Sequence, residues 1–490
     1  MRRAALALGA LLVTGAGGTA ADAAPRLPAL PAQVRVNVAG LGTDHAVIGS
    51  TGTLTVTRAD GSVVYRGAES VVARRDVRRI EGLAIPPRSA DDDSLSRDER
   101  VRLRREAREL VRELGPYAVV TVPFELAVLR ASSDGMGQAA VTADAVPPLR
   151  FAATDGALTY RGRAFRGSFE LALDDEGDMI VVNTVPTKDY LASVVGAEMP
   201  TAWEPEALAA QAVAARTYLA THLRRHRAYD LEGDVRDQEY GGIGSETAST
   251  VRAVERTAGI VATYRGGTIE ALYSANAGGV TEDSENVFAN ALPYLRSVPS
   301  PGDEVAASSS WGATSWRWTR ELTAPQLRDH LAVRGIAVGI PERIEILEKT
   351  SAGRVMRARI SGRDGTREIG KDQSRYYFGL RSTLFDVEKR AGGDLELVEH
   401  TATERRREVE ALGASRIGEV YRRAAADDGP RLVGTVYRLP DRFVFRGRGF
   451  GHGVGMSQWG AQGMALAGAS AEQILLHYYR GITLTNIGGA

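Results

Sequence analysis

Glu198 is the residue whose type and spacing best fit acid–base chemistry. It follows Leu191 and Val195 at helical intervals, so a helix capped by Thr187 would carry its carboxyl at the end of an apolar face. A second helix is expected to begin near Pro205 and to pack beside it. Partial desolvation would disfavour the anion and raise the pKa of the carboxyl toward that of a general acid at neutral pH. A capping or ion-paired structural glutamate explains the same position, and the pattern alone leaves both interpretations open.

Small residues mark two further places where chain segments can approach closely. The second helix is rich in alanine, and Gln211 and Tyr218 lie seven residues apart on one of its faces. Residues 274–286 follow a predicted strand, with Ser274 at the start and Gly278 and Gly279 near the centre. Such a segment lets a ligand reach the backbone. An ordinary acidic hairpin loop explains it equally well.

Residues 447–460, GRGFGHGVGMSQWG, form the densest motif. Its alternating glycines indicate a backbone that lines a groove, in which His452 could meet a substrate while Gln458 and Trp459 bond to and stack on a sugar. The spacing satisfies neither G-x-G-x-x-G nor the P-loop pattern, which argues against nucleotide binding, and Ser457 does not lie in G-x-S-x-G. A purely structural histidine remains the alternative.

Composition excludes several other chemistries. The 490 residues contain no cysteine, which removes disulfides, thiolate metal sites and a thiol nucleophile. A formal net charge of zero argues against general nucleic-acid binding. His222 and His226 stand four apart, but arginines surround them and H-E-x-x-H is absent, so we expect a solvated basic face, no metal and no cofactor. Core packing is preferred over sugar stacking for the three clustered tryptophans, Trp311, Trp316 and Trp318.

The N-terminus has the three parts of a secretory signal. Arg2 and Arg3 precede an apolar run from Ala4 to Gly18, and an A-x-A cleavage site ends at Ala23. We therefore expect residues 1–23 to be removed and the protein to work in the cell envelope or outside the cell. The rest of the sequence has no apolar run long enough for a membrane span.

Hydrophobic periodicity predicts an α+β fold. We expect strands from the N-terminal region, from 150–185 and from 258–288 to build sheets around the helical element that carries Glu198, and the glycine-rich motif to return to that element. A charged helix over 402–425 and a closing helix over 471–479 are also predicted. The expected organisation is a signal peptide (1–23), a β-rich region (24–149) with an inserted charged helix (88–114), a core (150–387), a charged insertion (388–440) and a C-terminal segment that completes the core (441–490).

Together the motifs resemble the SpoIID/LytB family of stage II sporulation protein D and amidase-enhancer proteins. The resemblance is close over 150–300 and 441–486 and looser over 311–387, which makes the core SpoIID-like. The segments that carry it are VVNTVPTKDYLASVVGAEMP (181–200), EALAAQAVAARTYL (206–219), ALYSANAGGVTEDSENVF (271–288), GRGFGHGVGMSQWGAQGMA (447–465) and ILLHYYRGITL (474–484).

The resemblance implies a lytic transglycosylase that acts on peptidoglycan glycan strands free of peptides. Such an enzyme cleaves between N-acetylmuramic acid and N-acetylglucosamine and leaves 1,6-anhydromuramoyl ends. The family's catalytic glutamate corresponds to Glu198, which would serve first as acid and then as base. The resemblance also implies that groove residues occupy the matching positions Gln211, Arg216, Tyr218, Ser274, Gly278, Gly279, His452 and Gln458.

A non-catalytic, wall-binding enhancer of an N-acetylmuramoyl-L-alanine amidase is the alternative. Some family members carry cysteine beside the Gly-Gly motif, where zinc can bind. Here Ala275 and Ala277 stand at that place. We therefore predict no zinc site of that kind, and we expect other contacts to hold the loop around Gly278.

Overall fold

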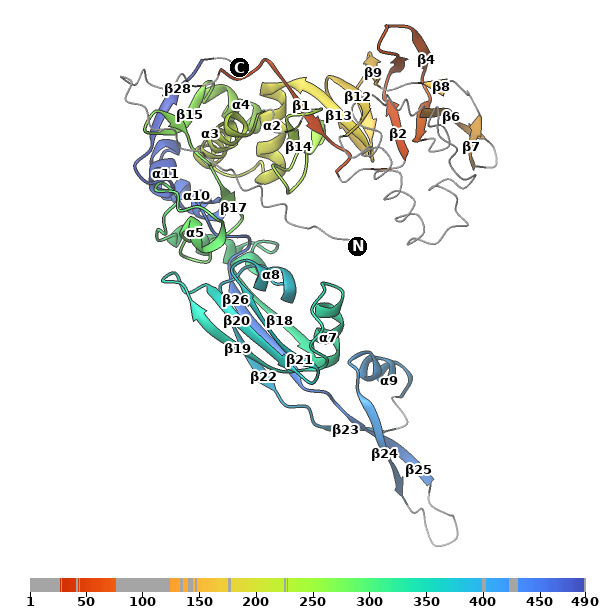
Figure 1. Cartoon of the computed structure of the whole chain (residues 1–490), viewed down its shortest axis with the longest axis vertical. Coiled ribbons are helices and arrows are strands. Elements are labelled where there is room, and N and C mark those ends of the chain that lie inside the picture. Colours follow the sequence, from red (N-terminus) through yellow and green to blue (C-terminus); the bar gives the residue numbers. More distant parts are fainter. Residues whose placement is uncertain are drawn as a thin grey trace, which may run out of the picture. The chain divides into compact units, whose positions relative to one another are not determined.

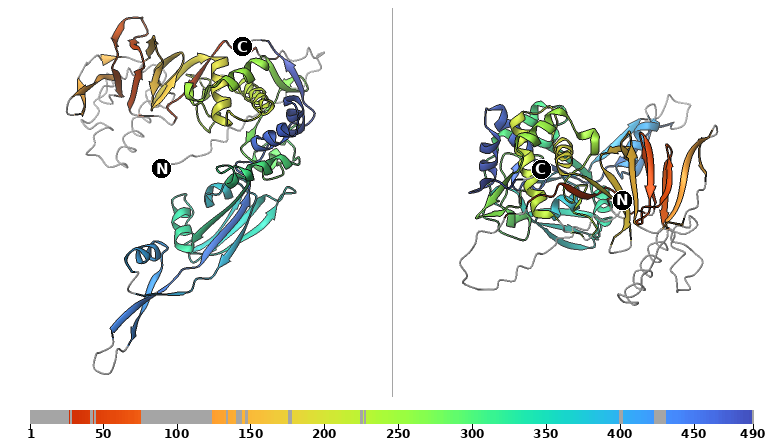
Figure 2. Two further views of the ribbon diagram at one scale, coloured as in Figure 1. Left: turned by 180° about the vertical axis from the view of Figure 1, so that it is seen from behind. Right: turned by 90° about the horizontal axis from the view of Figure 1, so that it is seen from above.

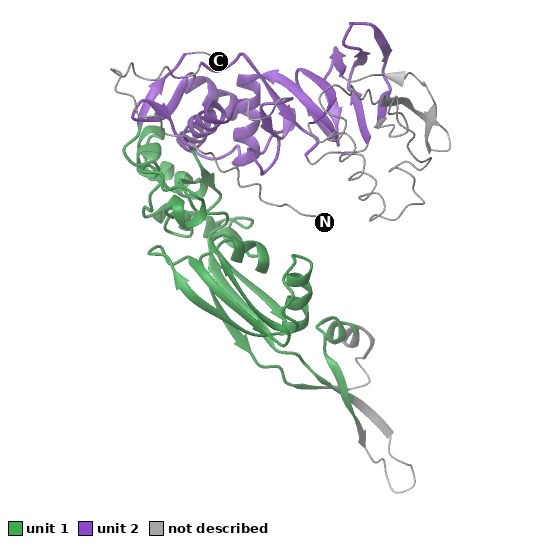
Figure 3. Cartoon of the chain, viewed as in Figure 1, with its two compact units in different colours: residues 1–23, 271–482 green, residues 24–270, 483–490 purple. Residues whose placement is uncertain are grey.

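The computed structural model describes residues 29–40, 45–75, 124–132, 135–139, 148–174, 178–223, 228–398, 402–422 and 431–488, with the single positions 27, 43 and 226 and the pair 144–145. These residues form two compact units (Figure 3), unit 1 over 271–482 and unit 2 over 29–270 and 483–488. The predicted signal peptide, 1–23, and the predicted charged helix, 88–114, lie outside the described residues.

Unit 2 contains two antiparallel-rich sheets that join the N-terminal strands to those of 149–186. In β1, Val34 and Val36 are fully buried and alternate with more exposed neighbours, as the period of a strand requires. One sheet has the order β14 (Leu231–Glu232), β1 (Gln33–Asn37), β13 (Met179–Pro186), β12 (Ser168–Leu173), β9 (Leu149–Thr154), β3 (Thr53–Thr57), β4 (Val63–Gly67). The other has the order β11 (Arg163–Phe165), β10 (Leu158–Tyr160), β2 (His45–Ser50), β5 (Ser70–Arg75), β6 (Phe124–Ser132), β7 (Gly135–Ala139), with β8 (Asp144–Ala145) paired to β6.

Helices α2 (Thr187–Glu198), α3 (Pro205–His222) and α4 (Ala248–Arg256) pack against one another in unit 2, with η1 (Gly242–Ser245) beside α2 (Figure 1). The alanines of α3 are buried, because small side chains allow neighbouring elements to approach closely. Thr187 does not cap α2 as predicted. The N-cap is Pro186, and the Thr187 hydroxyl donates instead to the carbonyl of Pro31, which anchors the start of α2 to the N-terminal segment.

The strands after α4 form small sheets that are separate from the two large ones. β15 (Ile260–Tyr264) forms the predicted hairpin with β16 (Gly267–Thr268) and pairs on its other side with β28 (Thr483–Asn486). β17 (Tyr273–Ser274) lies in unit 1 and pairs with β27 (Met456–Ser457) of the glycine-rich motif. These pairings are between distant segments, which local periodicity does not reveal.

Unit 1 has its largest apolar core between two three-stranded sheets and two helices. The core contains fully buried Phe378, Phe443 and Phe445. The sheets have the orders β18 (Arg317–Thr323), β26 (Arg442–Arg448), β22 (Phe385–Arg390) and β19 (Pro341–Lys349), β20 (Val355–Gly362), β21 (Gly365–Gly370), with helices α7 (Ala324–Ala332) and α8 (Gln373–Phe378). Further helical elements of the unit are α5 (Ser284–Val287), η2 (Pro301–Ser308), α6 (Ala313–Trp316), α10 (Gln458–Leu466) and α11 (Ala471–Tyr478).

Part of the charged segment 388–440 has a different structure from the one predicted. Helix α9 (Ala402–Ala411) ends well before residue 425, because Gly413 adopts a positive φ of 79° that suits a helix C-terminus. Strands β24 (Ser415–Arg422) and β25 (Arg431–Arg438) follow and form a long hairpin, with β23 (Asp394–Val398) on the other side of β25 (Figures 1 and 2). None of the helices in the described part of the chain has the length and apolarity needed to cross a membrane.

Candidate functional site

Glu198 is the last residue of α2, where the helix backbone stops and the side chain is half-buried. Leu191 and Val195 on the same face are fully buried, which confirms the apolar face predicted for this helix. The Glu198 Oε1 atom accepts a hydrogen bond of 3.0 Å from the backbone N–H of Glu239. A carboxylate at this position is therefore held by a rigid helix end on one side and by a fixed backbone donor on the other.

The segment 237–239 was not predicted to take part in the site, yet it surrounds Glu198 with ordered polar contacts. Asp237 Oδ1 accepts from the Tyr218 hydroxyl at 2.9 Å, and Asp237 Oδ2 accepts from the Glu232 backbone N–H at 2.8 Å. Gln238, which is fully buried, accepts from the Tyr190 hydroxyl at 3.1 Å. The segment thereby links helices α2 and α3. Its sequence signal, a short polar run that ends before Tyr240 and a glycine pair, is too weak to separate from an ordinary loop.

Glu239 adds a second half-buried carboxyl in this segment. Burial raises the pKa of Glu239, and the negative charge of Asp234 raises it further, while Arg163 acts in the opposite direction. The two glutamates are therefore neighbours in unit 2, because the backbone N–H of Glu239 donates to the carboxyl of Glu198.

Tyr218 lies on α3 and is nearly buried, and its predicted role as a groove residue stays a prediction. Its hydroxyl is committed to Asp237, and its ring stacks on His222 with the centroids 3.8 Å apart. His222 also lies 3.3 Å from Glu270. His226 follows the end of α3 and stacks on Tyr229, so the two histidines have separate partners. No cluster of potential metal ligands occurs among the residues that the structure describes.

Gln211 and Arg216, predicted as groove residues, are fully buried within unit 2. The Arg216 guanidinium donates to Thr257 Oγ1 at 3.2 Å and to the backbone carbonyl of Val254 at 3.0 Å. Burial lowers the pKa of Arg216 to about 10, so the group stays charged at neutral pH. The geometry makes Arg216 an internal clasp between α3 and the end of α4. It gives neither residue an exposed surface for a substrate.

Ser274, Gly278 and Gly279 belong to a tight loop in unit 1 that has fully buried Asp303 at its centre. Gly278 and Gly279 both have positive φ, 76° and 98°, which a side chain would strain. The Gly279 N–H donates to Asp303 Oδ2 at 2.9 Å, and the Ser457 hydroxyl donates to Asp303 Oδ1. Burial raises the pKa of Asp303. The Ser274 hydroxyl is buried and has no hydrogen-bond partner among the described residues.

Arg354 completes the contacts that hold this loop. Its side chain is buried, and the guanidinium donates to the carbonyl of Ala277 at 2.6 Å and to that of Val280 at 3.2 Å. Asn276 contributes as well, since its amide donates to the Asp303 carbonyl and its side-chain oxygen accepts from the Gly278 N–H. Hydrogen bonds with the side chains of Asn276, Asp303 and Arg354 therefore hold the loop around Gly278 in place.

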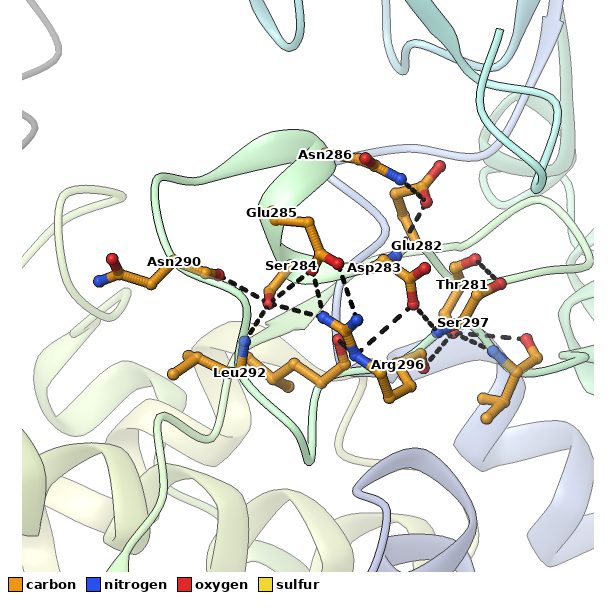
Figure 4. Close-up of polar contacts among 12 residues, drawn as sticks. Thr281, Glu282, Asp283, Ser284, Glu285, Asn286, Asn290, Leu292, Arg296 and Ser297 are labelled. Atoms are coloured by element: carbon orange, nitrogen blue, oxygen red, sulfur yellow. Dashed lines mark hydrogen bonds and ion pairs between the residues drawn. The ribbon is translucent and has the colours of Figure 1, made fainter.

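The acidic residues after the glycine pair act within the loop itself (Figure 4). Asp283 Oδ1 accepts from the Ser297 backbone N–H at 2.7 Å, and Glu285 pairs with Arg296. That ion pair lowers the pKa of Glu285 to about 2. Buried Glu282 accepts from its neighbour's N–H and from the Asn286 amide. The acidic residues thus have ordered polar partners, which for Glu282 include the Thr350 hydroxyl outside the loop.

His452 is partly buried in unit 1, between the glycine-rich motif and β17. Its Nδ1 atom accepts from the backbone N–H of Val454 at 3.0 Å, and its ring meets the ring of Phe288 edge to face. Burial, with the positive charge of Arg375 as a smaller cause, lowers the pKa of His452 to about 4. The imidazole is therefore neutral at neutral pH. The expected return of the glycine-rich motif to the helical element of Glu198 stays a prediction, since the motif belongs to unit 1 and Glu198 to unit 2.

We expect unit 1 to lose stability as the pH falls from 6.5 to 4. His330 resembles His452, because burial and then Arg334 and Arg320 lower its pKa to about 4. Both histidines bind protons more weakly in the folded state, so the unfolded state takes up more protons in this window and folding becomes less favourable. Denaturant unfolding at each pH measures the effect. The H330Q/H452Q variant should flatten the profile, whereas H45Q, at an exposed residue of unit 2, should not. An unchanged slope in the double variant would contradict this assignment.

Gln458 and Trp459 begin α10 and are nearly buried. The three predicted tryptophans separate into two kinds. Trp316 and Trp318 are core residues with 8% exposure, as predicted, but Trp311 is 58% exposed. The Trp311 ring lies against Trp459, with the centroids 4.9 Å apart and an angle of 37° between the planes. Trp311 is therefore an exposed ring that packs on the nearly buried ring of Trp459.

The fold and these contacts define an α+β protein with an ordered glutamate site in unit 2 and a glycine-rich, polar loop assembly in unit 1. Comparison with known proteins finds two family matches, one in each unit. Residues 175–264 match the family described as SpoIID, stage II sporulation protein, and residues 304–401 match a domain of unknown function, DUF8618. Glu198 lies within the first match, whereas Trp311 and most of the apolar core of unit 1 lie within the second.

Relatives that match 60–68% of this chain support the SpoIID assignment. The chain is 30% identical over 321 residues to stage II sporulation protein D of Bacillus amyloliquefaciens, covering 62% of this chain and 75% of that protein. It is 30% identical over 340 residues to an uncharacterized protein of Brachyspira hyodysenteriae, covering 68% and 75%. It is also 30% identical over 319 residues to the amidase enhancer of Bacillus subtilis, covering 60% of this chain and 40% of that protein. The chain belongs to the SpoIID family.

Proposed function

We propose that this protein is a lytic transglycosylase that cleaves peptide-free peptidoglycan glycan strands and uses Glu198 as its catalytic acid and base. The observation that carries the proposal is the placement of Glu198 within the SpoIID match, at the end of α2 with the Glu239 N–H on its carboxyl. A lytic transglycosylase needs no second carboxylate, because no water takes part in its reaction. Most glycoside hydrolases, by contrast, use a pair of carboxylates.

The proposed reaction has two proton transfers at one carboxyl. Protonated Glu198 gives its proton to the glycosidic oxygen between N-acetylmuramic acid and N-acetylglucosamine, and the bond from that oxygen to the muramoyl anomeric carbon breaks. The 6-hydroxyl oxygen of the same muramoyl residue then bonds to the anomeric carbon and gives its proton to the Glu198 carboxylate. The Glu239 N–H stabilises the negative charge that Glu198 carries between the two steps.

We also propose that the protein acts outside the cytoplasm after removal of residues 1–23. The support is the sequence signal at the N-terminus, and the substrate lies in the same compartment. N-terminal sequencing of the protein from its native host tests this. A mature chain that begins at residue 24 is the expected result, and retention of Met1 in the exported form would contradict it.

Digestion of purified, peptide-free glycan strands tests the activity. The expected products are fragments with 1,6-anhydromuramoyl ends, which mass spectrometry distinguishes by the absence of the water that a hydrolase would add. Fragments with reducing muramoyl ends would indicate hydrolysis instead. Intact strands after prolonged incubation would contradict a catalytic role for this chain.

A second candidate function is that of a wall-bound enhancer of a peptidoglycan amidase. The similarity to the amidase enhancer of Bacillus subtilis favours it. This function predicts binding to cell-wall sacculi without cleavage, and faster release of peptides when an N-acetylmuramoyl-L-alanine amidase is added. The two functions separate cleanly, because enhancement should survive E198Q whereas strand cleavage should not.

A further inference from the structure

A basic pocket of about 530 Å³ opens in unit 1 along strand β26. That volume is typical of sites for small molecules or for one or two sugar units. Arg446 and Arg448 of β26 line it together with Arg317 of β18 and Lys349 of β19, and Asp386 of β22 is its acidic residue. Four cationic side chains therefore face one carboxylate in a single pocket.

Two of these four cations are neutralised within the protein. Lys349 Nζ lies 2.6 Å from Asp386 Oδ1, and Arg446 Nη1 lies 2.8 Å from Glu388 Oε2. Both pairs join residues on adjacent elements of the same pocket wall. They leave Arg317 and Arg448 as its surplus positive charge.

Arg317 and Arg448 occupy directly opposed positions on β18 and β26. Both are exposed, and among the described residues neither forms an ion pair with a carboxylate. Like charges opposite one another across a strand pair are destabilising. Such an arrangement is understandable if the two guanidiniums are completed by an anion from outside, since arginine binds planar carboxylates through paired hydrogen bonds.

Trp318, Leu384 and Phe385 also border the pocket, but each is at most 8% exposed, and Trp318 and Phe385 belong to the apolar core of the unit. Gly447 stands opposite Trp318 across the strands, and a Cβ at residue 447 would come within 2.2 Å of the indole ring. A glycine is therefore needed here for the indole to lie flat against β26.

The pocket adjoins the loop that the sequence singled out as a ligand site. A Cβ at Gly278 would come within 2.9 Å of Leu384 and 3.2 Å of the Arg448 Cβ, so the glycine loop lies against two pocket residues. The pocket thus combines residues from the glycine-rich motif with residues from the DUF8618 match, 304–401.

We propose that this pocket binds the carboxylate of an anionic glycan, namely the lactyl carboxylate of N-acetylmuramic acid in a peptide-free strand. The exposed side chains of Arg317 and Arg448 take the carboxylate. In strands that carry peptides, this carboxylate is consumed in an amide bond and its charge is lost. The proposal rests on the proposed function for its choice of glycan, and it assigns the preference for peptide-free strands to unit 1.

Binding to three matched ligands tests the proposal in the full-length chain. The ligands are peptide-free glycan strands, the same strands with their carboxylates converted to neutral amides, and uncharged N-acetylglucosamine oligomers. We expect the charged strands to bind at least about 10-fold more tightly than the other two, as two charge-assisted hydrogen-bond pairs warrant, and less tightly as the salt is raised. Equal affinity for the charged and the amidated strands would overturn the proposal. Polyglycerol phosphate, a polymer with phosphate in place of carboxylate, is measured for comparison, and tighter binding of it than of the charged strands would also overturn the proposal.

Charge-matched variants locate the effect. R317Q/R448Q should lose about 10-fold in affinity for the charged strands only, without a fall in melting temperature, because it also removes a like-charge pair. R438Q/R442Q removes the same charge from two arginines that are paired with Asp394 and Glu321, and it should bind as the wild type does. Equal binding by R317Q/R448Q and the wild type would overturn the proposal. Strand cleavage is measured separately. Carboxylate-dependent binding without cleavage would refute only the catalytic proposal. Cleavage without carboxylate-dependent binding would refute only the proposal for this pocket.

Discussion

E198Q should abolish the cleavage of peptide-free glycan strands while leaving the fold intact. General acid–base catalysis by one positioned group contributes about 10²- to 10⁴-fold to a rate. Because Glu198 is proposed to act in both proton transfers, we expect a loss near the upper end, about 10⁴-fold, measured as anhydromuramoyl ends formed per unit time. The glutamine oxygen can still accept the Glu239 N–H that Glu198 Oε1 accepts at 3.0 Å, so the segment 237–239 should keep its place.

Two further substitutions at residue 198 test the position of the acid and its role as a hydrogen-bond acceptor. E198D keeps an acid but withdraws it from its place by one methylene, and a displacement of about 1 Å can cost about 100-fold in rate. E198A removes the acceptor of the Glu239 N–H as well as the acid, so it should loosen 237–239, visible as faster amide exchange there.

E206Q is the matched control on the neighbouring helix. Glu206 lies at the start of α3 and pairs with Arg256 at the surface. Removing this charge should change the rate by no more than about 2-fold, since surface pairs contribute little. Wild-type rates in E198Q, or equal losses in E198Q and E206Q, would refute the assignment of Glu198.

The elements near Glu198 were accessible from the sequence because their signals are local. The spacing of Leu191, Val195 and Glu198 within one helix predicted both the apolar face and the carboxyl at its end. The helix that begins after Ser470 was likewise predicted, and the Ser470 hydroxyl accepts the N3 backbone N–H as a capping residue does.

What the sequence could not give depends on contacts between distant residues. Arg216 looks like an ordinary exposed arginine, and only the end of α4 around residues 254–257 makes it an internal clasp. The role of Glu239 arises from a backbone contact with a residue 41 positions away. Trp311 and Trp318 are the same residue type seven positions apart, yet the pairing of β18 with β26 buries only the second.

D303A should be the most destabilising single change in unit 1. Asp303 is fully buried, and its two carboxylate oxygens accept from the Ser457 hydroxyl and the Gly279 N–H. Removing the acceptor leaves two buried donors without a partner, each at about 1–3 kcal/mol, so we expect a loss of roughly 3–5 kcal/mol in the free energy of unfolding. The burial that raises the pKa of Asp303 reduces the net value of the carboxylate, which is why the estimate stops short of the sum of the largest values.

S457A and E304A are the variants with which the loss of stability in D303A is compared. Ser457 Oγ donates to Asp303 and also accepts from the Ala277 and Gly460 N–H groups, so S457A should cost about 1–3 kcal/mol. Because the two side chains share one hydrogen bond, the double variant should lose less than the sum of the single losses, as contacting residues do. Glu304, the exposed neighbour of Asp303, should tolerate alanine within about 0.5 kcal/mol. Denaturant unfolding measures all four variants. If D303A unfolds as E304A does, Asp303 is not the centre that holds the glycine loop. If the single losses simply add, the hydrogen bond between the two side chains contributes nothing to the stability of unit 1.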